Sequence, residues 1–223
     1  MATGEGGALT PQQARGVYNR IGRMQDWQRF YEAPPVKDLI EHGEFDSARR
    51  VFELGCGTGA FARELLDDHL APAATYLGLD VSDTMVRLAS GRLAPWVERA
   101  DVHRVDGSIP LPGEDGGFDR FVAVYVFDLL DAEFTAGILS EASRLLATGG
   151  KLCTVGLTPG TTPISKAVSR GWQWLWARAP RVVGGCRPTS LEPGQTWRIL
   201  HRRVVTAWGV PSEVVVATPA RPD

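Results

Sequence analysis

Two periodicities of apolar and polar residues alternate along the central part of the chain. Short, nearly continuous apolar runs are typical of buried strands, and they predict strands at 50–54, 76–80, 101–105, 118–126 and 151–157. Between them apolar residues recur with helical spacing, which predicts helices at about 59–70, 83–93 and 132–147. Gly149-Gly150 is expected to end the third of these helices. This alternation predicts a doubly wound α/β domain with a mostly parallel sheet.

The pattern changes after residue 157. A helix is predicted near 164–178, and strand-like runs follow at 197–207 and 212–218 with only a short segment between them. A parallel pair of strands needs a long crossover connection. The two runs therefore predict an antiparallel β-hairpin at the end of the sheet.

The N-terminal segment precedes this domain. Residues 1–9 are small, polar or glycine, and we expect them to be disordered. Thr10 and Pro11 fit a helix start, Pro34-Pro35 is expected to end that helix, and a short helix should follow as far as Gly43. We divide the chain into a tail at 1–9, a helical lid at 10–47, and an α/β domain at 48–223 with a helical cover segment at 158–191.

Size and composition add few constraints. With 223 residues and a net charge of −2, the chain is expected to form one domain with a modest appendage. Its three cysteines are far apart and fit neither a disulfide framework nor a metal site, and its four histidines have no metal-ligand spacing. The sequence shows no signal-peptide pattern and no apolar run of about 18 residues. We therefore expect no metal and a cytoplasmic location.

Residues 51–59 carry the strongest chemical signal. An apolar strand enters a turn that contains Gly55, Gly57 and Gly59, and a helical pattern follows at once. Glycine permits positive φ and close approach of the backbone to a ligand, while the amides of a helix start favour an anionic group. Asp80, at the tip of the second strand, is placed to accept from ribose hydroxyls. These features predict a nucleotide-like cofactor, and the turn also fits the dinucleotide site of a nicotinamide-dependent oxidoreductase.

Three features favour another adenosine cofactor. Glu53 is ionisable although it lies at a buried strand end, two residues before the first glycine. Asp106 closes the third strand, where a carboxylate can accept from an adenine amino group. The terminal hairpin stands where a dinucleotide-binding domain would continue with a second mononucleotide-binding half.

These residues resemble the class I S-adenosylmethionine-dependent methyltransferases. The matching motifs are Glu53-Leu-Gly-Cys-Gly-Thr-Gly59, Gly78-Leu-Asp-Val-Ser82 with Met85, Asp106, Phe118-Asp119 and Leu145-Leu-Ala-Thr-Gly-Gly150. The resemblance covers roughly residues 48–157 and the order of the hairpin. It implies a Rossmann-like, seven-stranded sheet and S-adenosyl-L-methionine as the cofactor.

The same resemblance implies roles for individual residues. The methionine part of the cofactor would meet the turn and the residue before it, namely Glu53, Gly55, Cys56, Gly57 and Gly59. The ribose and adenine would meet Asp80, Val81, Asp106 and Gly107, and the methyl side would be lined by Ala123 and Tyr125. Leu129 departs from the family, because many members carry histidine there.

No catalytic base stands out in the sequence. Tyr125 and His201 are the remaining candidates, whereas Asp128 is interpreted as the N-cap of the next helix. Methyl transfer to a nucleophilic acceptor gains much of its rate from alignment, so a catalytic constellation is not required. We therefore predict a methyltransferase for a small-molecule or lipid-like acceptor. The alternatives are the nicotinamide-dependent oxidoreductase and a non-catalytic, cofactor-binding regulatory protein.

Residues 142–191 contain no Asp or Glu but seven Lys or Arg, which is the strongest charge asymmetry in the chain. Trp172, Trp174 and Trp176 lie in the same stretch, within a predicted helix. One interpretation is a helix that covers the acceptor pocket, and another is peripheral contact of 164–187 with an anionic membrane. A nucleic-acid substrate is disfavoured, since no Asn-Pro-Pro-Tyr-type motif follows the fourth strand. The sequence does not indicate an oligomeric state.

Overall fold

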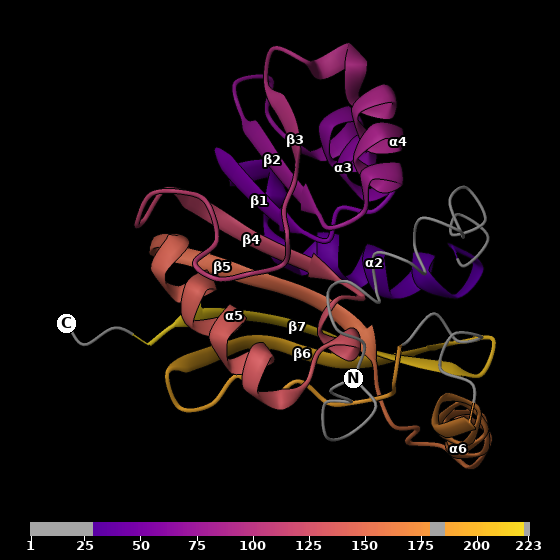
Figure 1. Cartoon of the computed structure of the whole chain (residues 1–223). Helices are drawn as coiled ribbons and strands as arrows, with labels where there is room; N and C mark the ends of the chain where they lie inside the picture. The colour runs from indigo at the N-terminus through magenta and orange to yellow at the C-terminus, as the bar shows by residue number, and fades with distance from the viewer. Residues whose placement is uncertain (1–28, 179–185, 221–223) are drawn as a thin grey trace.

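A seven-stranded sheet forms the centre of the computed structural model, which describes residues 29–178 and 186–220. The strand order is β3-β2-β1-β4-β5-β7-β6 (Figure 1). The strands are β1 (Arg50–Leu54), β2 (Thr75–Asp80), β3 (Ala100–Arg104), β4 (Phe118–Val124), β5 (Leu146–Leu157), β6 (Trp197–Ala207) and β7 (Val210–Pro219). Neighbours from β3 to β5 pair in parallel, whereas β7 is antiparallel to both β5 and β6. The predicted α/β sheet and its terminal hairpin are confirmed.

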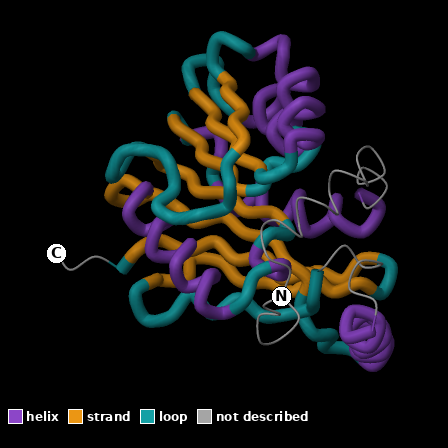
Figure 2. The backbone as a smooth tube through the Cα atoms, viewed as in Figure 1, coloured by secondary structure: helices purple, strands orange, loops and turns teal. Residues whose placement is uncertain are grey.

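Helices cover both faces of the sheet, as Figures 1 and 2 show. One face carries α2 (Arg29–Gly43), α3 (Ala60–Glu64) and α4 (Asp83–Leu93), while α5 (Ala132–Leu145) covers the other. The remaining described α-helix, α6 (Pro163–Arg178), lies beside the β6–β7 turn. Single helical turns are η2 (Phe45–Ser47), η3 (Leu65–His69), η4 (Ala94–Trp96) and η5 (Phe127–Leu129). Within the described ranges no helix is both long and apolar enough to cross a membrane.

The middle strands are apolar because both of their faces are buried. On β4, Phe121, Val122 and Ala123 are fully buried, and their alternating side chains enter the cores on opposite faces of the sheet. Phe121 stacks on Phe52 of β1, with 5.0 Å between the ring centroids. Burial of each such large side chain contributes about 1.5–3 kcal/mol to folding. This core holds the carboxyl ends of β1, β2 and β4 at one edge of the sheet.

The prediction that Pro34-Pro35 ends a helix was wrong. Helix α2 runs through both prolines and ends at Gly43. Proline fixes φ at a helical value, and the hydrogen bond that each proline lacks is outweighed here by packing. Tyr31, Pro35 and Leu39 recur every four residues and are buried against the body of the protein. The other part of the predicted N-terminal helix, residues 10–28, and the tail at 1–9 lie outside the described residues.

The predicted cap at Gly149-Gly150 was also wrong. Helix α5 ends at Leu145, and Leu146 is already extended, with φ −74° and ψ 134°. Both leucines are fully buried, so the chain leaves the helix where its side chains must enter the core of the sheet. The two glycines lie instead inside β5, near the irregular register with β4.

Candidate functional site

The glycine turn after β1 is built by backbone geometry that favours glycine. Gly55, Gly57 and Gly59 have φ values of +69°, +53° and +73°. The N–H groups of Gly55 and Cys56 donate to the carbonyl of Leu79 on β2, over 2.7 and 3.0 Å. A Cβ atom at Gly59 would lie 3.0 Å from Cα of Ala89, which packs α4 against the turn. The turn is therefore held tightly between two strands and two helices.

Asp80 joins this turn to the end of β2. Its Oδ2 accepts from the N–H of Gly57 over 3.0 Å, and its Oδ1 accepts from the N–H of Ser82 over 2.8 Å. The carboxyl is buried, which raises its pKa although these amides oppose the shift. Asp80 thus organises the turn and still reaches the adjacent cavity, a structural role that the sequence pattern alone did not show.

An apolar cavity opens beside Asp80. Its backbone edge is formed by Gly55, Gly57, Val81 and Gly107. Its walls are largely apolar side chains, among them Met85, Leu111, Leu129, Phe134 and Ile138. A carboxylate at the edge of apolar walls suits a flat ring system that carries hydroxyl groups. Phe134 and Ile138 were not singled out in the sequence, because apolar residues on a helix face indicate core packing in general.

A second cavity lies on the other side of the glycine turn. It is lined by Glu53 and by the start of the turn, Gly55–Thr58, and by Glu32, Ala33 and Val36 of α2. Gly55, Gly57, Val124 and Tyr125 line both cavities. Oε2 of Glu53 accepts from the hydroxyl of Tyr76 over 2.6 Å, and burial raises the pKa of Glu53 to about 8. A polar cavity with a buried carboxyl therefore adjoins an apolar one.

The raised pKa of Glu53 has a measurable consequence for stability. Between pH 4.5 and about 8 the folded protein keeps a proton on Glu53 that the unfolded chain releases. The free energy of unfolding therefore falls as the pH rises through this interval. We expect Glu53→Gln to remove this pH dependence, which is on the order of 5 kcal/mol over the whole interval. Urea unfolding at several pH values measures it, with Glu41→Gln, an exposed acid on α2, as the control. If the free energy of unfolding changed with pH equally in the wild type and in Glu53→Gln, the prediction would be contradicted.

Tyr125 stands at the junction of the two cavities in an uncommon conformation. Its φ is +55°, a value that few residues other than glycine adopt. The hydrogen bond from its N–H to the carbonyl of Val155 and the contact of its hydroxyl with Oγ of Ser212, at 2.9 Å, hold it there. Strained residues of this kind cluster at functional sites.

Four predicted site residues lie elsewhere, and the first is Gly59, which packs against Ala89 of α4 and lines neither cavity. Asp106 is exposed and forms an Asx-turn, since its Oδ1 accepts from the N–H and hydroxyl of Ser108, whereas its neighbour Gly107 lines the apolar cavity. Ala123 is buried in the core between the sheet and α5. His201 lies on β6, with Nε2 2.7 Å from Oδ2 of Asp38 on α2.

The surroundings of His201 form an ion-pair cluster. Its ring stacks on His42 with 3.6 Å between the centroids, and Nη1 of Arg203 donates to the other oxygen of Asp38 over 3.0 Å. Ligand atoms of Asp38, His42 and His201 lie within 4.8 Å of one another. No sequence spacing indicates this group, since 163 residues separate Asp38 from His201. The guanidinium on Asp38 already supplies the positive charge that a cation would bring.

Asp128 is not the N-cap that the sequence suggested. Asp131 caps α5 instead, with its Oδ1 accepting from the N–H of Phe134 over 2.7 Å. Asp128 lies in η5, is 2% exposed, and has no hydrogen-bond partner for either carboxylate oxygen among the described residues. Asp128 and Asp131 are both suitable N-cap residues for α5 by sequence, and the tertiary structure shows that Asp131 is the one that caps it.

Comparisons with known proteins agree with this geometry. Residues 51–150 match the model of a methyltransferase domain family. The chain is 32% identical over 167 residues to the demethylmenaquinone methyltransferase of Deinococcus radiodurans, covering 74% of this chain and 64% of the relative. It is 31% identical over 176 residues to the malonyl-[acyl-carrier protein] O-methyltransferase of Erwinia pyrifoliae, covering 77% of this chain and 60% of the relative. The chain thus spans less than two thirds of the length of these relatives.

Solved structures show the same fold. The [4+2]-cyclase SpnF superposes with a TM-score of 0.72 at 18% identity, covering 96% of this chain and 98% of the cyclase. Identity this low carries information on the fold alone. The match over residues 51–150, the related methyltransferases and the strand order agree with one another. Residues 51–150 therefore resemble a methyltransferase domain, and the described sheet has the fold of class I S-adenosylmethionine-dependent methyltransferases.

Proposed function

We propose that the protein transfers a methyl group from S-adenosylmethionine to a small-molecule acceptor. The observation that supports this most directly is the pair of cavities that meet at the glycine turn and Tyr125. One is apolar with a carboxylate at its edge and suits an adenosine group, and the other is polar with a buried acid and suits an amino-acid group. When bound, the cofactor supplies an electrophilic methyl group on a sulfonium.

The residues around these cavities support specific roles. Asp80 accepts from the ribose hydroxyls, and Val81 and Gly107 border the adenine. Gly57 gives the methionine part access to the backbone, while Glu53 pairs with its ammonium group. An ammonium group beside Glu53 favours the ionised carboxylate and so offsets the cost of its burial.

The acceptor side of the site is aromatic. The ring of Tyr31 on α2 lies 6.0 Å from that of Tyr125 and 6.5 Å from that of Trp172 on α6. Nε1 of Trp172 donates to the carbonyl of Cys186 over 2.9 Å, which ties α6 to the segment that follows it. We infer that α2 and the 158–191 segment together cover the acceptor, which would exclude water from the reacting groups. Residues 179–185 of this segment lie outside the described residues.

Calorimetry followed by a transfer assay tests the proposed function. We expect S-adenosylmethionine and its demethylated product to bind, and NAD not to bind. Transfer of a labelled methyl group to a component of a metabolite or lipid extract would then distinguish an enzyme from a protein that only binds the cofactor. Binding of NAD without S-adenosylmethionine would overturn the proposal.

We further propose that one end of the molecule contacts an anionic membrane. Phe30, Ile164, Trp174 and Trp208 are 56%, 73%, 58% and 81% exposed. Phe30 and Trp208 pack edge to face with 6.4 Å between centroids, and Ile164 lies beside Gly209 at the same hairpin turn. Helix α6 adds Lys166, Arg170 and Arg178, all exposed, and contains no acid. Aromatic and basic side chains together favour the interface of a bilayer.

Vesicle binding tests this contact. Each Lys or Arg near an anionic surface contributes about 1 kcal/mol at moderate salt. Replacing Lys166, Arg170 and Arg178 by Gln should therefore weaken co-sedimentation with phosphatidylserine vesicles about tenfold or more, without changing cofactor affinity. The control replaces three exposed arginines on α3, α4 and β3 by Gln, which changes the net charge equally: Arg63, Arg87 and Arg104. Absence of vesicle binding at low salt would contradict the proposal.

A further inference from the structure

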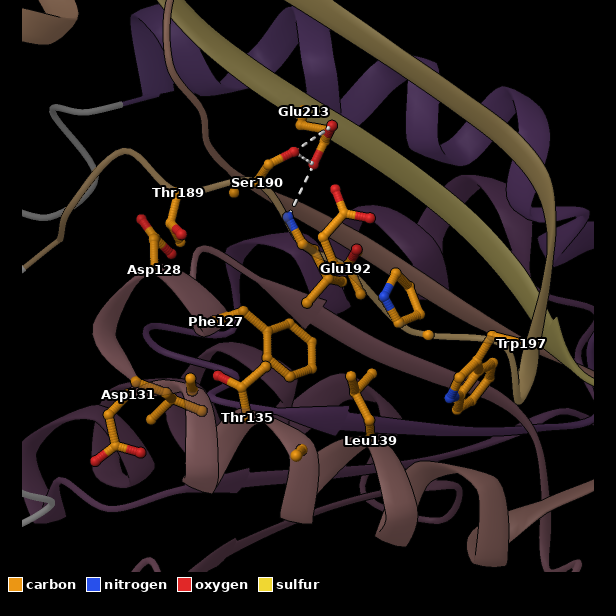
Figure 3. Close-up of a pocket in the computed structure, with 18 of the residues that line it drawn as sticks. Phe127, Asp128, Asp131, Thr135, Leu139, Thr189, Ser190, Glu192, Trp197 and Glu213 are labelled. Carbon is orange, nitrogen blue, oxygen red and sulfur yellow. Dashed lines mark hydrogen bonds between the residues drawn. The ribbon is translucent and has the colours of Figure 1, made fainter.

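A larger cavity, of about 640 Å³, lies on the other side of η5 from the cofactor cavities. Its walls are α5 and the segment 186–197, and β5 and β7 lie beneath it. Figure 3 shows Thr135 and Leu139 projecting from α5 toward this segment, with Asp128 at one end of the cavity and Trp197 at the other. Among the described residues it shares only Leu130 with the apolar cavity beside Asp80.

The course of the chain explains why this space is open. After β5 the chain forms α6 beside the β6–β7 turn, and the described residues that precede β6, 186–196, contain neither helix nor strand. A single irregular segment covers a narrower strip of the sheet than a helix does. The face of β5 and β7 between the segment and α5, which includes Thr154, Gly156 and Glu213, therefore lines a cavity.

Asp128 is the group in this cavity that needs a partner. Its side chain is buried, and neither oxygen has a hydrogen-bond partner among the described residues. Burial raises the pKa of Asp128 to about 7, although the Cys186 thiol and nearby backbone groups oppose the shift. Buried carboxylates are usually paired, because desolvation without a donor is costly. An unpaired one that lines a cavity is a natural contact for a ligand.

The other charged groups of the cavity are already engaged. Glu213 accepts from the hydroxyl of Ser190 and the N–H of Leu191, both over 3.0 Å, and from Nε of Arg202 over 2.9 Å. Asp131 caps α5, and Oε1 of Glu192 accepts from Nη2 of Arg202 over 2.9 Å. Arg187 is the one Lys or Arg among the described lining residues, and its Nη2 donates to the carbonyl of Leu130 over 3.2 Å. Asp128 is therefore the acid left to receive a positive ligand group.

Hydroxyl side chains are the commonest polar groups of the lining. Those of Thr135, Ser140, Ser143, Thr154, Thr189, Ser190 and Thr196 line the cavity. Hydroxyls both donate and accept, so they suit a ligand with several hydroxyl groups of its own. The side chains of Phe127, Leu139 and Trp197 add apolar contact.

We propose that this cavity binds a small amine that carries several hydroxyl groups, with its ammonium group paired to Asp128. The site stands independently of methyl transfer, because it can be occupied without the cofactor. Two sources share this ligand chemistry, an acceptor of the methyl group and an effector. Asp128 follows Tyr125 by three residues, and η5 is the wall between the cavity and the cofactor side.

Binding without cofactor tests the site directly. The probes are amino sugars and amino alcohols, each compared with its N-acetylated form, which keeps the hydroxyls and loses the positive charge. Saturation-transfer NMR should show that the amines bind and that N-acetylation weakens binding about tenfold or more, since charge-assisted hydrogen bonds are lost. Equal binding of both forms, or of neither, would overturn the proposal.

Three variants locate the binding. Asp128→Asn keeps the shape of the side chain and should weaken amine binding about tenfold or more. Thr135→Phe should also block binding, because the larger ring fills the cavity from α5. Glu133→Gln, an exposed acid on the same helix outside the lining, is the matched control. Thermal melts confirm folding, and unchanged amine binding by folded Asp128→Asn and Thr135→Phe would place the amine elsewhere.

Two further arms identify the source of the ligand. Transfer of labelled methyl to a bound amine identifies an acceptor, and an amine that stays unmethylated but changes S-adenosylmethionine affinity identifies an effector. Both results support the site. Calorimetry with S-adenosylmethionine alone reports on the proposed function, so failure of either idea is recognised separately.

Discussion

Replacement of Gly57 by valine is expected to abolish binding of S-adenosylmethionine, with the dissociation constant raised more than a hundredfold. Gly57 has φ +53°, which a β-branched residue adopts only at high cost. It also lines both cavities, so the branched carbons would occupy the space proposed for the methionine group. Calorimetry measures the loss, and circular dichroism shows whether the sheet remains folded.

A matched glycine provides the control for this experiment. Gly91 on α4 has no atom within 4 Å of a Cβ built on it, and its φ is not in the left-handed region. Gly91→Val should therefore bind the cofactor as the wild type does. If Gly57→Val bound the cofactor normally, the turn would be structural only, and the proposed position of the methionine group would be wrong.

Replacement of Asp80 by alanine is expected to weaken cofactor binding by about tenfold to a hundredfold. Two losses combine: the charge-assisted hydrogen bonds to the ribose, each worth about 1.5–3 kcal/mol, and the acceptor that holds the N–H of Gly57. Asp80→Asn separates them in part, because the amide oxygen still accepts from one backbone N–H while the charge is lost. The order of affinities should be wild type, Asp80→Asn, then Asp80→Ala.

Asp101→Ala, an exposed acid on the neighbouring strand β3, serves as the control for Asp80. It should leave affinity unchanged. Wild-type affinity in a folded Asp80→Ala protein would remove Asp80 from the cofactor site. Reduced thermal stability with unchanged affinity would assign it to the turn alone.

The fold limits the alternatives but does not choose the reaction. The nicotinamide alternative is not supported, since the sheet closes with the β7–β6 hairpin where a second mononucleotide-binding half would continue. The same fold is found in a [4+2]-cyclase. Fold and reaction are separable, so the transfer assay decides between methyl transfer and another use of the cofactor site.

Local patterns were sufficient to predict most of the sheet. Strand β1 was predicted at 50–54 and observed at Arg50–Leu54, and helix α4 was predicted and observed over the same residues. Strands buried on both faces need continuous apolar runs, and a tight turn before a helix needs glycine, so these elements follow from neighbours in sequence. The Gly55–Gly59 turn and Asp80 were found in this way.

Tertiary structure decided whatever depends on residues distant in the sequence. Because of packing, α2 continues through Pro34-Pro35. His201 pairs with Asp38 on α2, and Asp131 rather than Asp128 caps α5. The cavity against α5 exists because residues 186–196, which precede β6, form no helix, and no local pattern specifies this. Periodicity reports which face of an element is buried, whereas the partner of a polar side chain is set by the three-dimensional path of the chain. The sequence by itself therefore determined the sheet and the glycine turn, whereas only the tertiary structure placed Asp128 beside a cavity without a side-chain hydrogen bond from the described residues.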